Sequence, residues 1–238
     1  MKELTLGTLR ARIAGGTDRD GGGNGPVVVL MHGFGAPGTD LVPLWRELNV
    51  PQAVRFVFPE APLELGFGGR AWWNLDMVRL QDRFRAGAVE RMIAEVPEGI
   101  SEARSAVLSL LAALERDFGA KLEELTIGGF SQGAMLATDI VLRSERNFAG
   151  LAVLSGTLIS HAEWLPLMPA RRGLTVLQSH GRADPILPFA LAERLRDELT
   201  SAGLAVDFIA FNGGHGIPAP ALAGLAKLVS RVAGSVSS

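Results

Sequence analysis

The residue of this 238-residue chain whose surroundings most clearly indicate a chemical role is a serine between two glycines. Gly129-Phe-Ser131-Gln-Gly133 fits the pattern G-x-S-x-G, which forms a sharp turn between a strand and a helix, the nucleophile elbow. Glycine suits the flanking positions because it has no Cβ to clash where the chain turns back. The serine then stands near the N-terminus of the following helix, where developing negative charge is stabilised. The spacing predicts nucleophilic catalysis at Ser131; the alternative is a glycine-rich turn with an idle serine.

A serine nucleophile needs a histidine base, which in turn needs a carboxylate to hold its tautomer. Enzymes with such an elbow carry these groups in the order serine, acid, histidine. Of the three histidines after Ser131, only His215 lies in a glycine-rich loop between the last predicted strand and the last predicted helix. We therefore expect His215 to be the base, and His161 and His180 to be structural or exposed.

Asp184 is the best candidate for the acid. It directly follows a predicted strand, at the edge of the sheet where ligands bind in open α/β folds. Asp197 falls within a predicted helix and Asp207 within a strand, so we expect both to face solvent. The alternative for Asp184 is an Asx-type turn before Pro185. The predicted catalytic triad is Ser131, Asp184 and His215.

A tetrahedral intermediate carries an oxyanion that needs preorganised hydrogen-bond donors. One expected donor is the backbone N–H of Gln132, the residue after the nucleophile, and the other is the backbone N–H of Phe34 in the loop after the first core strand. His32, two residues before Phe34, is interpreted as bracing that loop rather than as a catalyst.

Aromatic side chains suggest where a substrate would bind. Trp72, Trp73 and Phe67 lie in a long Pro/Gly/Trp loop over residues 59–74, a length that is usually functional. Ile186 and Leu187 follow the predicted acid and are candidates for the same pocket. The alternative for the three aromatic residues is that they cover the core as a lid. The alternative for Ile186 and Leu187 is that they pack within the core. The sequence has no metal-ligand cluster, phosphate-binding loop or dinucleotide fingerprint, so we expect neither a metal nor a cofactor.

The elements that would position these residues alternate between strand and helix. Residues 3–14 are predicted to form edge strands. A continuous apolar run predicts a strand buried on both faces of a parallel sheet over residues 26–31. Further strands are predicted over residues 53–58, 124–130, 149–154, 174–178 and 205–211. Thr39 and Asp40 can cap a helix over residues 40–48, and the spacing of apolar residues predicts a helix over residues 101–118. Further helices are predicted over residues 82–96, 134–142, 188–202 and 219–233. This alternation predicts one α/β domain over residues 1–238, a mostly parallel doubly wound sheet flanked by helices.

Composition and net charge limit which binding partners and which cellular location we expect. A net charge of −2 gives no reason to expect nucleic acid or an anionic membrane as a partner. The absence of cysteine excludes disulfides, a thiolate nucleophile and a cysteine-ligated metal. No stretch is apolar enough for a secretory leader or a membrane span. Unless a leader has been removed, we expect a cytoplasmic protein without stable membrane association. The sequence does not decide between a monomer and a homodimer.

At these residues the chain resembles the phospholipase/carboxylesterase family of α/β-hydrolases, which includes acyl-protein thioesterases and bacterial carboxylesterases. The matching stretches run in family order over about residues 26–230. They are Val-Val-Leu-Met-His-Gly-Phe-Gly, Phe-Val-Phe-Pro-Glu-Ala-Pro, Ala-Trp-Trp-Asn, Gly-Phe-Ser-Gln-Gly, Ser-His-Gly-Arg-Ala-Asp-Pro-Ile-Leu-Pro and Gly-Gly-His-Gly-Ile-Pro. The resemblance implies an α/β-hydrolase fold and hydrolysis of carboxylic esters or thioesters, with oxyanion donors at Phe34 and Gln132.

Three departures from the family pattern affect the expected acyl and leaving groups. Ala36 stands where the family often has Asp, and Asn74 ends a Trp-Trp-Asn stretch where the family usually has Trp-aromatic-Asp. Residues 82–100 look longer than in the thioesterases and are a candidate cap.

The resulting hypothesis is a cofactor-independent serine carboxylesterase that hydrolyses small-molecule esters of short-to-medium acyl chain. An acyl-protein thioesterase or a lysophospholipase is the nearest alternative. The rival from another class is a catalytically inactive α/β-hydrolase that serves as a binding module. Such modules commonly lack a member of the triad, whereas all three residue types are present here.

Overall fold

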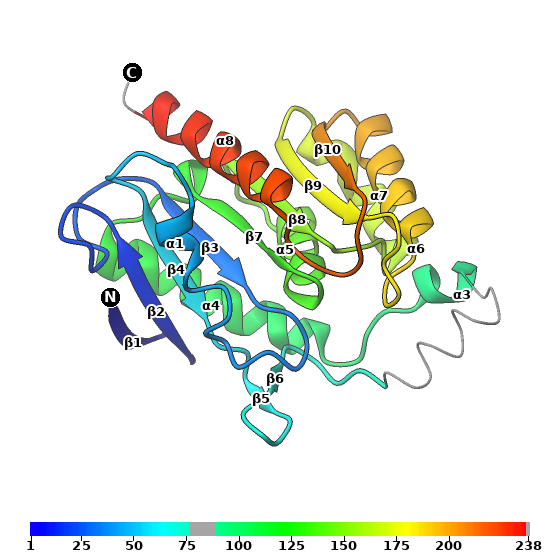
Figure 1. Cartoon of the computed structure of the whole chain (residues 1–238), viewed down its shortest axis with the longest axis horizontal. Coiled ribbons are helices and arrows are strands. Elements are labelled where there is room, and N and C mark those ends of the chain that lie inside the picture. Colours follow the sequence, from blue (N-terminus) through cyan, green and yellow to red (C-terminus); the bar gives the residue numbers. More distant parts are fainter. Residues whose placement is uncertain (77–88, 237–238) are drawn as a thin grey trace.

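One eight-stranded sheet runs through the computed structural model, which describes residues 1–76 and 89–236 (Figure 1). Its strands are β1 (Lys2–Leu6), β2 (Leu9–Gly15), β3 (Val27–Met31), β4 (Arg55–Pro59), β7 (Thr126–Phe130), β8 (Gly150–Leu154), β9 (Thr175–Gly181) and β10 (Ala205–Phe211). They lie in the order β1-β2-β4-β3-β7-β8-β9-β10. The β1–β2 and β2–β4 pairs are antiparallel and all other pairs are parallel.

Helices cover both faces of the sheet. The α-helices are α1 (Leu44–Glu47), α3 (Val89–Ala94), α4 (Ile100–Phe118), α5 (Gln132–Arg143), α6 (His161–Trp164), α7 (Phe189–Ser201) and α8 (Ala219–Val236), and the 3₁₀ helices are η1 (Leu122–Glu124) and η2 (Leu165–Arg171). Helices α4, α5 and α7 share one buried apolar cluster, whereas α1 and α8 pack into a second. Figure 1 shows α8 and α4 on opposite sides of the sheet.

Strand β3 shows why the central strands read as continuous apolar runs. Its five residues are all buried. Val28 and Leu30 belong to the cluster under α1 and α8, and Val29 and Met31 to the cluster under α4 and α5. Successive side chains of a strand point to opposite faces, so a strand covered on both faces is apolar at every position.

The predicted fold class is confirmed: the structure is an α/β fold with a mostly parallel sheet flanked by helices. One predicted helix is shorter in the structure. The helix expected over residues 40–48 is only the four-residue α1, because turns with Thr39–Val42 and Leu41–Leu44 hydrogen bonds precede it. The helix expected over residues 82–96 is described only in part, as α3, and residues 82–88 of the candidate cap lie outside the described residues.

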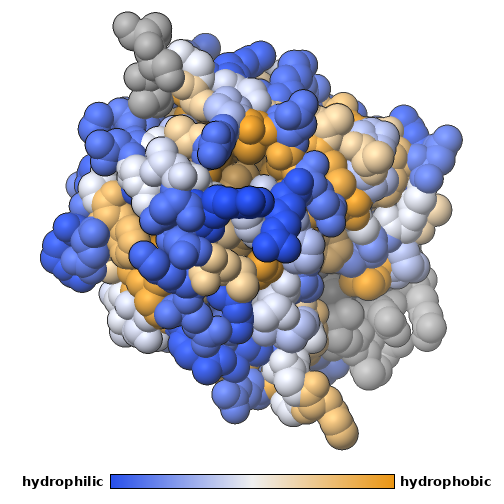
Figure 2. Space-filling view, turned by 60° about the vertical axis from the view of Figure 1, so that its left-hand side comes forward, coloured by the Kyte–Doolittle hydropathy of each residue, from blue (hydrophilic) through white to orange (hydrophobic). Residues whose placement is uncertain are grey.

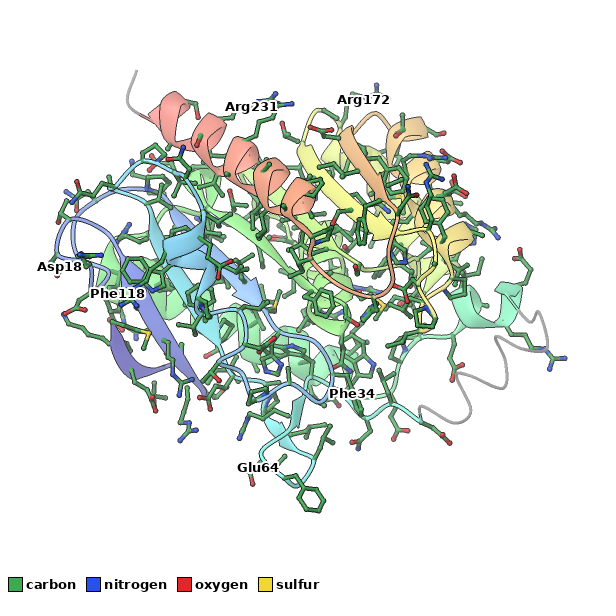
Figure 3. The ribbon with its side chains drawn as sticks, viewed as in Figure 1. Asp18, Phe34, Glu64, Phe118, Arg172 and Arg231 are labelled. Atoms are coloured by element: carbon green, nitrogen blue, oxygen red, sulfur yellow. The ribbon has the colours of Figure 1, made fainter. Side chains whose placement is uncertain are left out.

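The loop expected over residues 59–74 contains a short antiparallel hairpin. Strand β5 (Leu63–Glu64) pairs with β6 (Arg70–Ala71). The hairpin projects from the rest of the molecule, and Figure 3 shows Glu64 on it. Its tip is Gly66-Phe67-Gly68, with φ of 76°, 47° and 79°. This tip holds a large aromatic residue away from the core.

Hydrophobic and hydrophilic residues alternate over short distances on the surface. On the face drawn in Figure 2, hydrophobic residues are visible in separate areas between hydrophilic ones. Within the described parts of the chain, no helix combines the length and apolar character needed to cross a membrane.

Candidate active site

Ser131 occupies the turn between β7 and α5. Its φ of 54° and ψ of −116° lie outside the helical and extended regions that non-glycine residues ordinarily adopt. The backbone N–H of Ser131 donates to the carbonyl of Leu154 at the end of β8, at 2.9 Å. Such a strained conformation persists only where the surroundings hold it, and it is typical of functional sites. The serine therefore sits at the carboxyl edge of the sheet, on a rigid turn.

The two glycines of the elbow are required by close backbone contacts. A Cβ on Gly129 would lie 2.4 Å from the carbonyl oxygen of Met31 and 2.6 Å from the carbonyl carbon of Gly133. A Cβ on Gly133 would lie 2.2 Å from the oxygen of Met31 and 2.6 Å from that of His32. The start of α5 thus rests directly on the end of β3, which fixes Ser131 relative to the loop that follows β3.

We expect Gly133→Ala to destabilise the fold by about 3 kcal/mol, because the backbone atoms that the methyl group meets cannot move without shifting β3. Urea unfolding followed by circular dichroism measures this loss. Gly234→Ala is the matched control: Gly234 also lies in a helix, α8, and a Cβ there has open space. A helical glycine replaced by alanine without a clash gains about 0.5–1 kcal/mol. Equal stability of the two variants would contradict the close-contact account of the elbow.

Asp184 and His215 meet at the ends of neighbouring strands. Asp184 follows β9 and His215 follows β10. His215 Nδ1 lies 2.7 Å from Asp184 Oδ2, and a carboxylate oxygen only accepts, so Nδ1 carries the proton. In the neutral ring, the other nitrogen, Nε2, is then an acceptor. The backbone N–H groups of Ile186 and Leu187 donate to Asp184 Oδ1, both at 2.9 Å. These contacts fix both oxygens of the acid.

The environment of Asp184 keeps it ionised. Burial raises the pKa of the carboxyl, but hydrogen bonds from His180, His215 and the amides of Leu187 and Ile186 outweigh it. Together they hold the pKa well below its usual range. At neutral pH the buried carboxylate is available to stabilise positive charge on His215.

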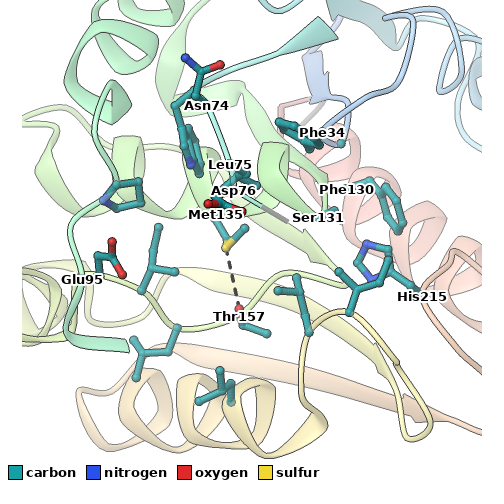
Figure 4. A pocket seen from close by; sticks show the side chains of 18 of the residues that line it. Phe34, Asn74, Leu75, Asp76, Glu95, Phe130, Ser131, Met135, Thr157 and His215 are labelled. Carbon is teal, nitrogen blue, oxygen red and sulfur yellow. Dashed lines mark hydrogen bonds between the residues drawn. The ribbon is translucent and has the colours of Figure 1, made fainter. Parts of the chain in front are cut away.

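Ser131 and His215 line the same cavity, with Phe34 and Phe130 close by (Figure 4). The His215 ring packs against the Phe130 ring, with centroids 4.7 Å apart. The hydrogen bonds recorded for residues 1–76 and 89–236 include none between Ser131 Oγ and His215 Nε2. Catalytic hydrogen bonds in free enzymes are often long and tighten only when substrate binds.

The loop after β3 is braced by His32. Its Nδ1–H donates to the carbonyl of Gly33 at 2.8 Å, and its Nε2 accepts from the N–H of Ala61 at 3.0 Å. Burial lowers the pKa of His32, which favours this neutral form. Phe34 follows and lines the cavity beside Ser131. The geometry matches the bracing interpretation of His32.

Gln132 makes contacts that the sequence did not indicate. As the first residue of α5, it has no intrahelical partner for its backbone N–H, which leaves that group available at the helix N-terminus. Its side chain is fully buried and reaches the 59–74 loop: Oε1 accepts from the N–H of Trp72 at 2.9 Å, and Nε2 donates to the carbonyl of Trp73 at 2.8 Å. One residue therefore ties the elbow to the loop that carries both tryptophans.

The cavity has a volume of about 420 Å³ and mostly apolar walls. Its lining comes from the loops after β3, β6, β7, β8, β9 and β10, from residues before α4, and from helices α5 and α7. Thr157 Oγ1 lies 3.8 Å from Met135 Sδ at its wall (Figure 4). The apolar side chains of the lining are Phe34, Trp73, Leu75, Pro97, Phe130, Met135, Leu158, Ile159, Ile186, Leu187 and Leu191.

The structure brings some of the predicted pocket residues to this cavity and not others. Trp73 and Ile186 line it. Trp72 does not: its indole Nε1–H donates to the carbonyl of His32 at 2.9 Å, which buries the ring against His32 instead. Phe67 does not either, since the hairpin tip leaves its side chain fully exposed. Both expectations of a lining role are therefore corrected.

The other two histidines after Ser131, His161 and His180, lie in a helix and a strand. His161 is in α6 and contacts Glu198 of α7, with 3.3 Å between Nε2 and Oε1. His180 is fully buried at the end of β9. Across the described ranges of the chain, no three metal-ligating side chains gather closely enough to share an ion.

Comparisons with known proteins agree with this arrangement. Residues 20–232 match the family model described as Phospholipase/Carboxylesterase. Acyl-protein thioesterase 1 of Neurospora crassa is 29% identical over 196 residues, which are 79% of each chain. The solved structure of esterase PE8 superposes with a TM-score of 0.74 at 25% identity, covering 93% of this chain and 99% of that one. A carboxylesterase from Mesorhizobium loti, 19% identical, has the same fold with a TM-score of 0.74, covering 96% and 98% of the two chains.

Proposed function

Because this chain belongs to the phospholipase/carboxylesterase family, we propose that it is a serine hydrolase that cleaves carboxylic esters of short-to-medium acyl chain. The observation that carries the proposal is the convergence on one cavity of Ser131, on a strained turn, and His215, held by Asp184 at 2.7 Å. A nucleophile and a base oriented by an acid are the parts that acyl transfer through a serine requires.

The proposed reaction has two stages. His215 Nε2 takes the proton of Ser131 as Oγ attacks the ester carbonyl, and Asp184 stabilises the imidazolium through Nδ1–H. The backbone N–H groups of Gln132 and Phe34 would receive the oxyanion of the tetrahedral intermediate. Breakdown of that intermediate passes the proton to the leaving alcohol and leaves an acyl-enzyme. Water, activated in the same way by His215, then releases the acid and restores Ser131.

The size and lining of the cavity support the proposed range of substrates. A volume of about 420 Å³ is near the lower end of the roughly 300–1,000 Å³ typical of small-molecule sites. The apolar part of the walls offers contact to an acyl chain. The polar or charged lining residues besides Ser131 are Asn74, Asp76, Glu95, Glu98, Thr157 and His215. A small ester therefore matches the cavity better than a large polar one.

A thioester is the second candidate substrate. The Neurospora crassa relative is named an acyl-protein thioesterase, and the same serine chemistry cleaves a thioester with a thiolate as leaving group. Thioester and ester hydrolysis differ in the leaving group, so substrates matched in acyl chain separate the two.

The experiment is a series of p-nitrophenyl esters from acetate to palmitate, with S-acyl analogues of the same chain lengths. We expect kcat/KM to be highest at short-to-medium chains and higher for esters than for the matched thioesters. A maximum at palmitate, or a clear preference for thioesters, would favour a lipid or acyl-protein substrate instead. Absence of hydrolysis at every chain length would contradict the proposed function and favour a binding module.

A further inference from the structure

A second histidine, His180, contacts the carboxylate that holds His215. Its Nε2 lies 3.3 Å from Asp184 Oδ2 and 2.9 Å from the carbonyl oxygen of Leu187. Oδ2 is also the oxygen that contacts His215 Nδ1. His180 is fully buried and does not line the cavity, so it touches the acid from behind and no substrate reaches it.

The neighbours of His180 determine where its proton lies. A carboxylate and a backbone carbonyl only accept, so Nε2 must carry a hydrogen, which both oxygens share. The other nitrogen, Nδ1, is buried and has no hydrogen-bond partner among the residues that the structure describes. Leaving a buried polar atom unpaired costs about 1–3 kcal/mol, and an apolar side chain of similar size would avoid that cost. Packing alone therefore does not explain a histidine at this position.

We propose that His180 is a positioning residue for the proposed triad, and that it holds Asp184 Oδ2 in line with His215 and draws charge from that oxygen. The inference rests on the proposed function. Without the Nε2–H group, Oδ2 would keep one fewer donor, and the carbonyl of Leu187 would lose the contact that anchors the segment after Asp184. The carboxylate would turn more freely and present more negative charge to His215.

Few other groups contact Asp184, so a change in His215 in a His180 variant can be assigned to the contact between His180 and Asp184. Among the described residues, the titratable side chains that contact Asp184 are His180 and His215. Arg182 lies over the Phe189 ring instead, with Cζ 5.0 Å from its centroid. On α7, Arg194 is ion-paired with α3 at the surface.

The test compares His180→Leu, which removes the donor, with His180→Gln, whose amide N–H can reach the position of Nε2. We expect His180→Leu to lower kcat by about 100-fold through misplacement of His215, with KM changed less than about twofold. We also expect the acid limb of the kcat/KM profile, which reports His215, to move to higher pH by about half a unit because more negative charge faces the imidazolium. His180→Gln should recover most of both changes.

His161→Leu is the matched control, because His161 Nε2 also lies 3.3 Å from a carboxylate oxygen, that of Glu198, but outside the cavity. It should leave kcat and the acid limb unchanged. If His180→Leu does not fold, His180→Asn, whose amide is too short to reach Oδ2, takes its place against His180→Gln.

The inference is overturned if the donor-less variant keeps the wild-type kcat and acid limb. It is also overturned if the Leu and Gln variants lose activity equally while the limb stays in place, since that pattern indicates a structural role only. An NMR titration of the His215 ring in the same variants measures its pKa without substrate. A wild type that hydrolyses no ester would refute the proposed function, and the NMR shift would still decide whether His180 acts on His215.

Discussion

Ser131→Ala should abolish ester hydrolysis, lowering kcat by about 10⁶-fold for an ester that the wild type cleaves well. Removing the nucleophile of a serine hydrolase leaves only the contribution of the oxyanion donors and of binding. Alanine has no hydroxyl to attack the ester, and His215 then has no proton to take. The fold should persist, because the structure shows no side-chain hydrogen bond of Ser131 that alanine would break within the described residues. The measurement is kcat and KM on the best ester of the p-nitrophenyl series.

Ser101→Ala is the control for Ser131→Ala. Ser101 is exposed on α4, its hydroxyl donates to Glu102, and it is not among the residues that line the cavity. A serine-directed fluorophosphonate should add its mass to the wild type and to Ser101→Ala, and not to Ser131→Ala. Full esterase activity in Ser131→Ala, or labelling of that variant, would refute the assignment of the nucleophile.

Asp184→Asn should lower kcat by about 10⁴-fold with little change in KM. The asparagine side chain retains the shape of the acid, but its amide favours the wrong tautomer of the histidine, which leaves Nε2 unable to accept the serine proton. It also removes the negative charge that stabilises the imidazolium. Steady-state kinetics at pH 7 test this expectation, with Asp197→Asn, an exposed aspartate on α7 that contacts Arg196, as the control.

The same substitution should change how stability depends on pH. The pKa of Asp184 is depressed in the folded protein relative to about 3.9 in the unfolded chain. Its ionised form therefore contributes stability above about pH 4, and that contribution is lost as the pH falls toward the folded pKa. Between pH 5 and pH 3 (roughly, from that unfolded value), the wild type should lose more unfolding free energy than Asp184→Asn. Parallel curves for the two proteins would contradict the depressed pKa.

Sequence reasoning identified the candidate catalytic residues because their chemistry restricts their type, order and position. A serine in an elbow, an acid after one strand and a histidine after the next must all reach the carboxyl edge of a parallel sheet. The structure brings Asp184 Oδ2 and His215 Nδ1 to 2.7 Å, and Ser131 lines the same cavity as His215. The role of each residue in catalysis stays a prediction that the variants above test.

The pocket could not be predicted in the same way, because an aromatic residue in a loop carries no signal of its direction. Phe67 and Trp72 come from one loop and have similar chemistry, yet one is fully exposed and the other fully buried. A positive φ at Phe67 turns it outward, and the bond from the Trp72 indole to the carbonyl of His32 turns that ring inward. The Trp72 contact joins segments far apart in the sequence, so the sequence alone does not show it. The sequence predicts His180 only as structural or exposed, because it does not show that the turn after β9 brings Asp184, four residues later, back to the His180 ring.

The double role of Gln132 limits where the substrate range of this protein can change by mutation. Gln132 is the first residue of α5, directly after the nucleophile, and its side chain hydrogen-bonds to the backbone of Trp72 and Trp73. A substitution that shifts the backbone of the segment carrying Trp73 therefore also disturbs the elbow, so selectivity and rate cannot be tuned separately there. Leu191 and Ile159 line the same cavity from other segments. We expect directed evolution toward new acyl groups to change selectivity at those two residues without disturbing the elbow.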